Sequence, residues 1–410
     1  MTVILRPLPS VETFHILVGT TVRKPPDVLG AYLESLTRQE LPDRVEVSYC
    51  FVDDNTDERS SLLLKVFAEK HKGTILSPET PREGYDDQHP VTHQWSQAAM
   101  GRVGHLKNRI IQFGLEHRFD GVWFCDADIL CDPGTLRSLW SLDVPIACAV
   151  YWTHWHNPAV VQGKLHAAPQ VWLQHPYQLD GRGMEAAEFR KQLVDREVTE
   201  VWGQGACTLV RRDVFEKGVS FSYIDGVPTD GMMGGEDRHF CLRAEALHIP
   251  MKADPWPDIF HVYHPQDRQK ITQMLARLNR DRPSQVTLGA LVSLRLEALE
   301  PVPVGPGQAM HLPPQYVRGV FGQVPMLPEV QEQVAHMNRG DSVILGVHFP
   351  SHHPSTWLRG QRRLVRVTLL DTKPFGFPPV LEQEMLQGTS SHADQTTFTP
   401  EQHRAMELVA

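Results

Sequence analysis

Gly121-Val122-Trp123-Phe124-Cys125-Asp126-Ala127-Asp128 joins an apolar run to a pair of carboxylates. The run predicts a buried strand, and the ligands of open α/β sheets gather where such strands end. Two carboxylates spaced i, i+2 at this place can share a divalent cation, because Mg²⁺ and Mn²⁺ prefer oxygen ligands and often add substrate phosphates to them. The alternative is a solvated turn, since Asp-x-Asp also arises by chance.

Short β-rich runs alternate with amphipathic helical stretches on both sides of this segment, from residue 14 to about residue 265. Residues 14–19 and 45–52 predict two further strands, and residues 103–118 predict a helix. Alternation of this kind predicts a mostly parallel sheet with helices on both faces. The sequence therefore predicts an α/β domain over residues 1–265.

The chain changes character beyond this domain. Residues 266–300 predict a helical connection of two helices, and residues 301–328 carry seven prolines, which is typical of a linker. Residues 329–410 contain two β-like runs, 342–348 and 363–370. We expect this last part to be an accessory region with some β structure and not a second active site.

Composition limits the class of protein. The 40 basic and 49 acidic side chains give a formal net charge of −9, which argues against coating nucleic acid through bulk charge. The six cysteines are scattered without a CxxC pair, which predicts reduced buried thiols and argues against a zinc site on thiolates. No signal peptide pattern is seen, and no window approaches the ~18–20 apolar residues of a membrane span. The sequence predicts a soluble, cytoplasmic protein.

Three other groups of polar residues are candidates for chemistry. Asp53-Asp54 ends the second predicted strand and is suited to accept hydrogen bonds from a nucleobase or a ribose, although turns and helix caps use the same residues. Gly234-Gly235 precedes Glu236-Asp237, where a carboxylate is a candidate general base or simply favours the first turn of a helix. His261 and His264 are candidate metal ligands, although a lone histidine is usually structural.

The order of these signals resembles an inverting glycosyltransferase of the GT-A (Rossmann-like) fold, and is most similar to glycosyltransferase family 2. The resemblance covers roughly residues 14–265 and departs from the family in a long polar loop at 78–102 and an insert-like stretch at 152–200. The matching motifs are Gly19-Thr20-Thr21, Phe51-Val52-Asp53-Asp54-Asn55, Lys107-Asn108-Arg109, Trp123-Phe124-Cys125-Asp126-Ala127-Asp128, Gly203-Gln204-Gly205-Ala206-Cys207, Gly235-Glu236-Asp237 and His261.

The resemblance implies an enzyme that moves a sugar from a nucleoside-diphosphate sugar, such as a UDP- or GDP-sugar, to an acceptor hydroxyl. It implies a divalent cation, Mn²⁺ or Mg²⁺, that neutralises charge on the leaving diphosphate. The acceptor stays open among a glycan, a lipid, a protein, a small metabolite and modified nucleic acid, because such enzymes contact it through their variable parts.

The resemblance also implies a role for each matching residue. Donor-binding residues are Thr20, Asp53, Asp54, Lys107, Arg109 and Asp126. Metal ligands are Asp126, Asp128 and His261, with His264 as the alternative to His261. The general base is Asp237, with Glu236 as second choice, and the acceptor contacts are Trp202 and Gly205.

Three other functions remain open at this point. A retaining GT-A glycosyltransferase is one, since a Glu-Asp pair does not set the stereochemistry. A nucleotidyltransferase would share the sheet and the metal carboxylate, but it would usually show a Gly-rich phosphate loop, of which residues 19–24 are a poor version. A non-catalytic module that binds sugar or nucleic acid is favoured by the aromatic run at 151–156, whose rings can stack on a sugar or a base.

Overall fold

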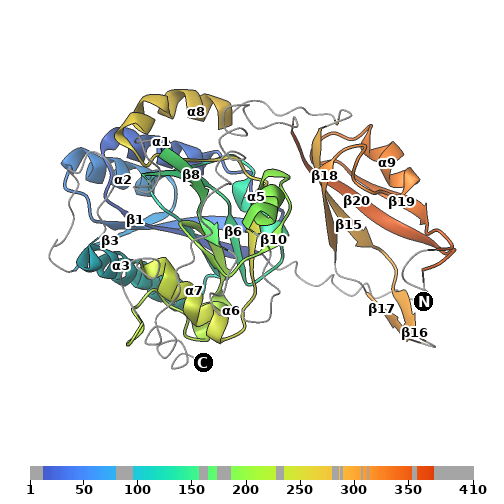
Figure 1. Ribbon diagram of the computed structural model, residues 1–410, viewed down its shortest axis with the longest axis horizontal. Coiled ribbons are helices and arrows are strands. Elements are labelled where there is room, and N and C mark those ends of the chain that lie inside the picture. Colours follow the sequence, from blue (N-terminus) through green and yellow to red (C-terminus); the bar gives the residue numbers. More distant parts are fainter. Residues whose placement is uncertain are drawn as a thin grey trace, which may run out of the picture. The chain divides into compact units, whose positions relative to one another are not determined.

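A computed structural model of the chain shows two compact units (Figure 1). The first contains most of the described residues up to Leu278, and the second contains the described residues from Val286 onward. The residues that the structure describes are 13–79, 96–156, 165–172, 186–227, 235–278, 286, 290–305, 308–311, 314–352 and 358–373.

An eight-stranded sheet forms the centre of the first unit, in the order β10-β13-β6-β12-β4-β1-β2-β3. Strands β1, β2, β3 and β4 pair in parallel, as do β6 and β13, whereas β12 and β10 are antiparallel to their neighbours. This confirms the predicted α/β class with a mainly parallel sheet. The strands are β1 (Phe14–Val22), β2 (Val45–Asp53), β3 (Gly73–Leu76), β4 (Gly121–Cys125), β6 (Ile146–Ala149), β10 (Thr199–Glu200), β12 (Cys207–Arg211) and β13 (Met251–Asp254).

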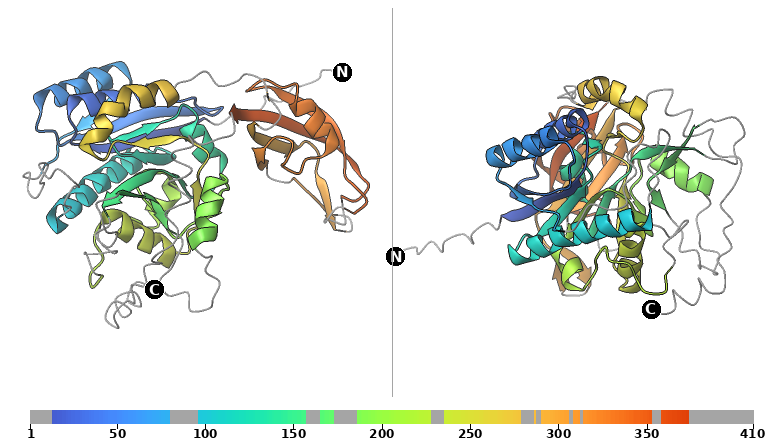
Figure 2. Two further views of the ribbon diagram at one scale, coloured as in Figure 1. Left: turned by 45° about the horizontal axis from the view of Figure 1, so that its top comes forward. Right: turned by 90° about the vertical axis from the view of Figure 1, so that its left-hand side faces the viewer.

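Helices cover both faces of this sheet (Figure 2). Successive residues of β1 point to opposite faces, so Ile16 and Val18 enter one buried cluster and Leu17 enters the other. The first cluster packs against α1 (Pro26–Thr37), α2 (Glu58–Lys70), α4 (Thr135–Ser141) and α8 (Ile271–Leu278). The second packs against α3 (Gln97–Glu116), α5 (Ala186–Val194), α6 (Arg212–Glu216) and α7 (Glu236–Ala246).

Three short antiparallel strand pairs are formed by segments that connect the strands of the main sheet. They are β5 (Ile129–Cys131) with β14 (Ile259–His261), β7 (Trp152–His156) with β8 (Leu165–Pro169), and β9 (Val171–Trp172) with β11 (Gly203–Gln204). A 3-10 helix, η2 (Pro265–Lys270), follows β14. The stretch expected to be an insert at 152–200 thus contains β7, β8, β9, α5 and β10.

The helix predicted at 103–118 begins earlier than expected. It starts at Gln97, because the Ser96 side chain accepts a hydrogen bond from the N–H of Ala99 and caps the first turn. Residues 97–102 are therefore helical and do not belong to the long polar loop expected at 78–102. Residues 80–95 of that loop lie outside the described residues.

The second unit is a four-stranded antiparallel sheet, ordered β18-β15-β20-β19, with one helix packed on its buried face. Its strands are β15 (Leu291–Ala298), β18 (Gln315–Val320), β19 (Ser342–His348) and β20 (Arg362–Lys373), its helix is α9 (Pro328–Val334), and a hairpin adds β16 (Val302–Gly305) and β17 (Gln308–Met310). The β-like runs expected at 342–348 and 363–370 are confirmed as β19 and β20.

Two predictions for this region are wrong. The second helix expected within 266–300 is the strand β15, because Val292 and Leu294 alternate into a core that its partner strands supply. The segment 301–328, expected to be a linker, contains β16, β17 and β18; Pro303 lies in the two-stranded hairpin, where a missing N–H is tolerated. Among the described residues, no helix is long and apolar enough to cross a membrane.

Candidate functional site

Asp126 and Asp128 lie in the turn that links β4 to β5, at the carboxyl end of a central strand. The N–H of Asp126 donates to the carbonyl of Ala206 over 3.0 Å, and the N–H of Ile129 donates back to the carbonyl of Asp126 over 2.9 Å. The turn is thus tied to the neighbouring strand and to itself. This is the place in an α/β sheet at which the sequence predicts a ligand.

Asp128 lies between two basic side chains, Lys24 and His261. Its Oδ2 lies 2.6 Å from Lys24 Nζ and 3.7 Å from His261 Nε2. The other ring nitrogen of His261, Nδ1, lies 2.8 Å from the hydroxyl of Thr153, which orients the imidazole. Burial raises the pKa of Asp128, but the Lys24 ammonium and the His261 ring outweigh it and hold this pKa well below its usual range.

His261 reaches Asp128 because β14 pairs with β5. In this pair His261 is opposite Ile129, the residue that follows Asp128, and the N–H of Val262 donates to the carbonyl of Asp128 over 2.9 Å. His264, the alternative ligand, instead begins η2, where its backbone N–H donates to the carboxylate of Asp267. The structure therefore brings His261, not His264, to the aspartate pair.

Asp126 belongs to a second cluster, built around the ammonium group of Lys107. Lys107 Nζ lies 2.9 Å from Glu236 Oε1 and 3.1 Å from Asp237 Oδ1. The same nitrogen lies 3.7 Å from Asp126 Oδ1. Since Lys107 is 1% exposed, one buried cation is shared among three carboxylates. The structure thus gathers four residues to which the sequence gave donor or catalytic roles.

Two glycines allow α3 and α7 to bring these charges together. Gly104, one turn before Lys107 on α3, packs so closely that an added Cβ would lie 2.6 Å from the carbonyl oxygen of Phe221 and 3.0 Å from Glu236 Cβ. Gly235 has φ of +104° at the N-cap of α7, a conformation that glycine adopts without strain. The predicted start of a helix at Glu236 is confirmed, while Gly234 lies outside the described residues.

Burial and mutual repulsion shift the titration of this cluster. Burial raises the pKa of Asp126 to about 7, and the Lys107 ammonium opposes the rise. Burial also raises the pKa of Asp237 to about 6, with Lys107 again opposing it and Glu236 adding to it. For Lys107, burial alone would lower the pKa, but the three carboxylates raise it well above its usual range. Lys107 therefore stays charged, and Asp126 and Asp237 titrate close to neutrality.

Asp54, expected to hold a nucleobase, is buried in a bidentate ion pair. Arg102 Nε and Nη2 donate to its two oxygens over 2.9 and 2.7 Å. Asp53 accepts hydrogen bonds from the backbone N–H and the side-chain amide of Asn55, which is the turn chemistry held open as the alternative. The sequence reasoning missed both Arg102 and Lys24. The one sequence signal for Lys24 is its place at the end of the weak phosphate-loop pattern at 19–24. For Arg102 the one signal is a positive charge five residues before Lys107.

The remaining expected donor residues are Arg109 and Thr20. Arg109 pairs with Glu79 over 2.7 Å and donates to the carbonyl of Ser77, next to β3. Thr20 is buried within β1, and its hydroxyl donates to the carbonyl of Thr21 over 3.4 Å.

Gly205, one of the two expected acceptor residues, packs against Tyr151, which in turn contacts His261. An added Cβ on Gly205 would lie 2.6 Å from the Tyr151 hydroxyl, so only glycine leaves room for this ring. That hydroxyl accepts a hydrogen bond from the N–H of Ala206, and the ring packs edge-on against His261 at 5.2 Å between centroids. Trp202 is buried just before β11. The side chains of residues 154–156 lie outside the described part.

A divalent cation fits Asp128 and His261. Their nearest atoms are 3.7 Å apart, a separation that one ion can bridge with bonds of about 2.0–2.2 Å, and a carboxylate with an imidazole suits Mn²⁺. Lys24 already provides a positive charge at Asp128, so the carboxylate is placed to bind a cation.

No protein-family model matches the chain, and no curated protein sequence matches it. Among solved structures, S. aureus TarS 1-349 is 13% identical and covers 65% of this chain with a TM-score of 0.34; the match spans 65% of that fragment. The S. aureus TarS structure is 15% identical, covers 66% of this chain with a TM-score of 0.34, and only 40% of its length is matched. The mannosyltransferase PcManGT from Pyrobaculum calidifontis is 17% identical, with 68% of each chain covered and a TM-score of 0.34.

Proposed function

We propose that this chain is a metal-dependent glycosyltransferase that moves a sugar from a nucleoside-diphosphate sugar to an acceptor hydroxyl. The observation that carries the proposal is the position of Asp126 and Asp128. They lie at the end of a central strand, where Asp128 is 3.7 Å from His261 and where burial raises the pKa of Asp126 to about 7 and that of Asp237 to about 6. The similar structures are a mannosyltransferase with GDP-Man and Mn²⁺ and TarS with UDP. These names are consistent with the proposal, which does not rest on them.

Asp128 and His261 are the proposed metal ligands, with Asp126 as the neighbouring carboxylate. When bound, the cation neutralises negative charge on the leaving diphosphate, which stabilises the transition state. Lys24 supplies a second positive charge at the same place, since its Nζ is within 2.6 Å of Asp128. Tyr151 and Thr153 hold the imidazole of His261 in position.

Asp237 is the proposed general base of an inverting displacement. Its side chain is 26% exposed, against 10% for Glu236, so it is the member of the α7 pair that an acceptor reaches. Asp237 takes the proton of the acceptor hydroxyl as that oxygen forms a bond to the anomeric carbon and the bond to the diphosphate breaks. A pKa of about 6 leaves the carboxylate ionised at neutral pH yet basic enough to accept the proton.

Asp128→Ala in the full chain tests the proposal. Mn²⁺ together with UDP- or GDP-sugars should raise the melting temperature of the wild-type protein, because ligands of the folded state stabilise it. The variant should lose this shift and turn over donor on the order of a hundred-fold more slowly. Asp213→Ala, which removes an exposed carboxylate of α6, is the matched control. Full activity and unchanged metal dependence in Asp128→Ala would contradict the assignment.

A nucleotidyltransferase is the second candidate, and the position of Lys24 favours it. The residue lies just after β1 and contacts the metal-site carboxylate, as a phosphate-binding lysine of such an enzyme would. The two functions differ in their product. A glycosyltransferase releases a nucleoside diphosphate, whereas a nucleotidyltransferase releases pyrophosphate. Anomeric analysis of the glycosylated product then separates inversion from retention.

A further inference from the structure

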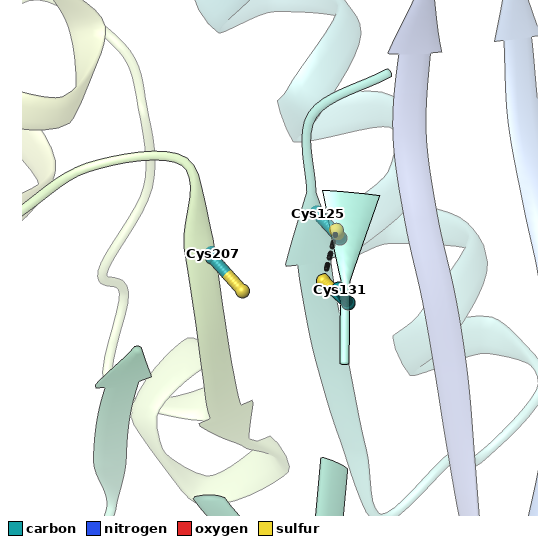
Figure 3. Close-up of side chains that lie close together, drawn as sticks. All are labelled: Cys125, Cys131 and Cys207. Atoms are coloured by element: carbon teal, nitrogen blue, oxygen red, sulfur yellow. Dashed lines mark hydrogen bonds between the residues drawn. The ribbon is translucent and has the colours of Figure 1, made fainter. Parts of the chain in front are cut away.

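Three cysteines lie close together in the core (Figure 3), and two of them flank the aspartate pair in the chain. Cys125 ends β4, Cys131 ends β5 and Cys207 begins β12. Their sulfur atoms all lie within 4.8 Å of one another, and the Cys125 and Cys131 sulfurs are 3.5 Å apart. All three side chains are at most 1% exposed. We call this group the thiol cluster.

Strand pairing creates the thiol cluster, which explains why chain spacing did not reveal it. Cys207 is directly opposite Cys125 in the antiparallel pair of β12 and β4. The turn that carries Asp126 and Asp128 then brings the chain back, so that Cys131 returns to Cys125. The chain has no CxxC pair, which argued against a thiolate site, but a sheet brings cysteines together without such spacing.

The distances suit one soft metal ion. Three sulfurs bound at about 2.3 Å around one centre lie about 4.0 Å apart in a trigonal plane. The Cys125 and Cys131 sulfurs are 3.5 Å apart and no pair of the three exceeds 4.8 Å, so small side-chain rotations suffice. Among the described residues, no carboxylate or imidazole joins the three sulfurs as a fourth ligand. A three-sulfur site favours Cu⁺ over Zn²⁺, because protein zinc sites are almost always four-coordinate.

A buried donor next to the cluster also indicates a negative group there. The indole Nε1–H of Trp123 is buried and has no hydrogen-bond acceptor within the described part of the chain. Trp123 lies two residues before Cys125 on β4, and both side chains enter the same buried cluster on one face of the sheet. A metal–thiolate group would be an acceptor for this indole, and the indole N–H would offset part of the buried charge of that group.

We propose that Cys125, Cys131 and Cys207 form a trigonal site for a soft, thiolate-binding metal ion, with Cu⁺ preferred. Binding displaces the thiol protons, and each sulfur donates an electron pair to the ion. The ion links β4 and β12 of the main sheet to β5. It thereby fixes the chain on both sides of the turn that bears Asp126 and Asp128. The site is independent of the donor site and of the reaction proposed there.

Titration of the full-length, reduced protein with Cu⁺ under anaerobic conditions tests this inference. One equivalent should bind in competition with a chromophoric Cu⁺ chelator, give a thiolate-to-metal charge-transfer band and raise the melting temperature. Cys207→Ala should abolish the band. Cys50→Ala, which removes an equally buried thiol outside the cluster, should retain it. Zn²⁺ added in place of Cu⁺ should bind far more weakly.

X-ray absorption of the Cu⁺-loaded wild-type protein gives a readout that needs no variant to fold. The inference predicts three sulfur neighbours at about 2.3 Å. Two outcomes would overturn it: no Cu⁺ bound against the chelator, or a copper–thiolate band that persists in folded Cys207→Ala.

Discussion

Lys24 Nζ lies 2.6 Å from Asp128 Oδ2, although 104 residues separate the two in the chain. The contact joins the end of the first strand to the turn after the fourth. We expect a lysine in this position to compete with the proposed metal ion for the carboxylate until anionic phosphates bind both cations. On the proposed function, the pair would couple metal binding to donor binding.

Lys24→Met should separate these two effects. In the absence of nucleotide, the variant should bind Mn²⁺ more tightly, on the order of tenfold, because Asp128 no longer has a competing cation. With Mn²⁺ present, it should bind the nucleoside diphosphate more weakly, because one positive charge is missing. Isothermal titration with Mn²⁺ and then with nucleotide measures both, and Lys217→Met, on an exposed pair of α6, is the control. Weaker Mn²⁺ binding in Lys24→Met would show that no competition exists.

The rate of glycosyl transfer should fall below about pH 6. The pKa of Asp237 is raised to about 6, so the carboxylate form that accepts the proton is populated above this pH and is lost as pH falls through it. Asp237→Asn should remove this acidic limb together with most of the turnover. Nucleotide affinity should stay near that of the wild type. The measurement is a pH–rate profile of both proteins.

The contrary result for Asp237 is also informative. If Asp237→Asn lost nucleotide affinity and kept its chemistry, Asp237 would belong to the donor site, and Glu236 would become the candidate base. Asp213→Asn, with an exposed carboxylate on α6, should leave the pH profile unchanged.

The ion pair of Asp54 with Arg102 should contribute to folding and not to nucleotide choice. Both side chains are buried, so Asp54→Leu leaves an uncompensated guanidinium and should cost about 3–5 kcal/mol of unfolding free energy. Arg102→Met in the same background should recover much of that loss. Denaturant unfolding of the two single variants and the double variant measures the coupling. A change of preferred nucleotide in Asp54→Leu, without loss of stability, would instead place Asp54 in the donor site.

The second unit should be dispensable for donor hydrolysis. It has its own buried cluster, built on Val292, Leu294 and Val367, while the proposed site residues all lie in the first unit. A chain that ends after residue 286 should fold and hydrolyse the donor with Mn²⁺ at a rate close to that of the full chain. Circular dichroism verifies the fold. Loss of hydrolysis in a folded truncated chain would place part of the site in the second unit.

Local patterns determined the elements that carry the site. The apolar run before Asp126 predicted β4 and the turn after it, and the glycine before Glu236 predicted the start of α7. Both signals work because the period of apolar residues and the backbone freedom of glycine act within a few residues of the chain. The α/β class followed from the same short-range patterns, repeated along the first unit.

Long-range packing decided which residues meet. The strand β15 is one example, since its partner strands β18 and β20 overrode the helix that its own residues suggested. The thiol cluster is another, because it depends on the register that sets Cys207 opposite Cys125. The sequence pointed to most residues of the candidate site, but only the fold decides whether Lys107 faces Glu236 or Asp54 faces Arg102. These contacts join positions 129 and 48 residues apart, and no local preference of the chain specifies such a distance.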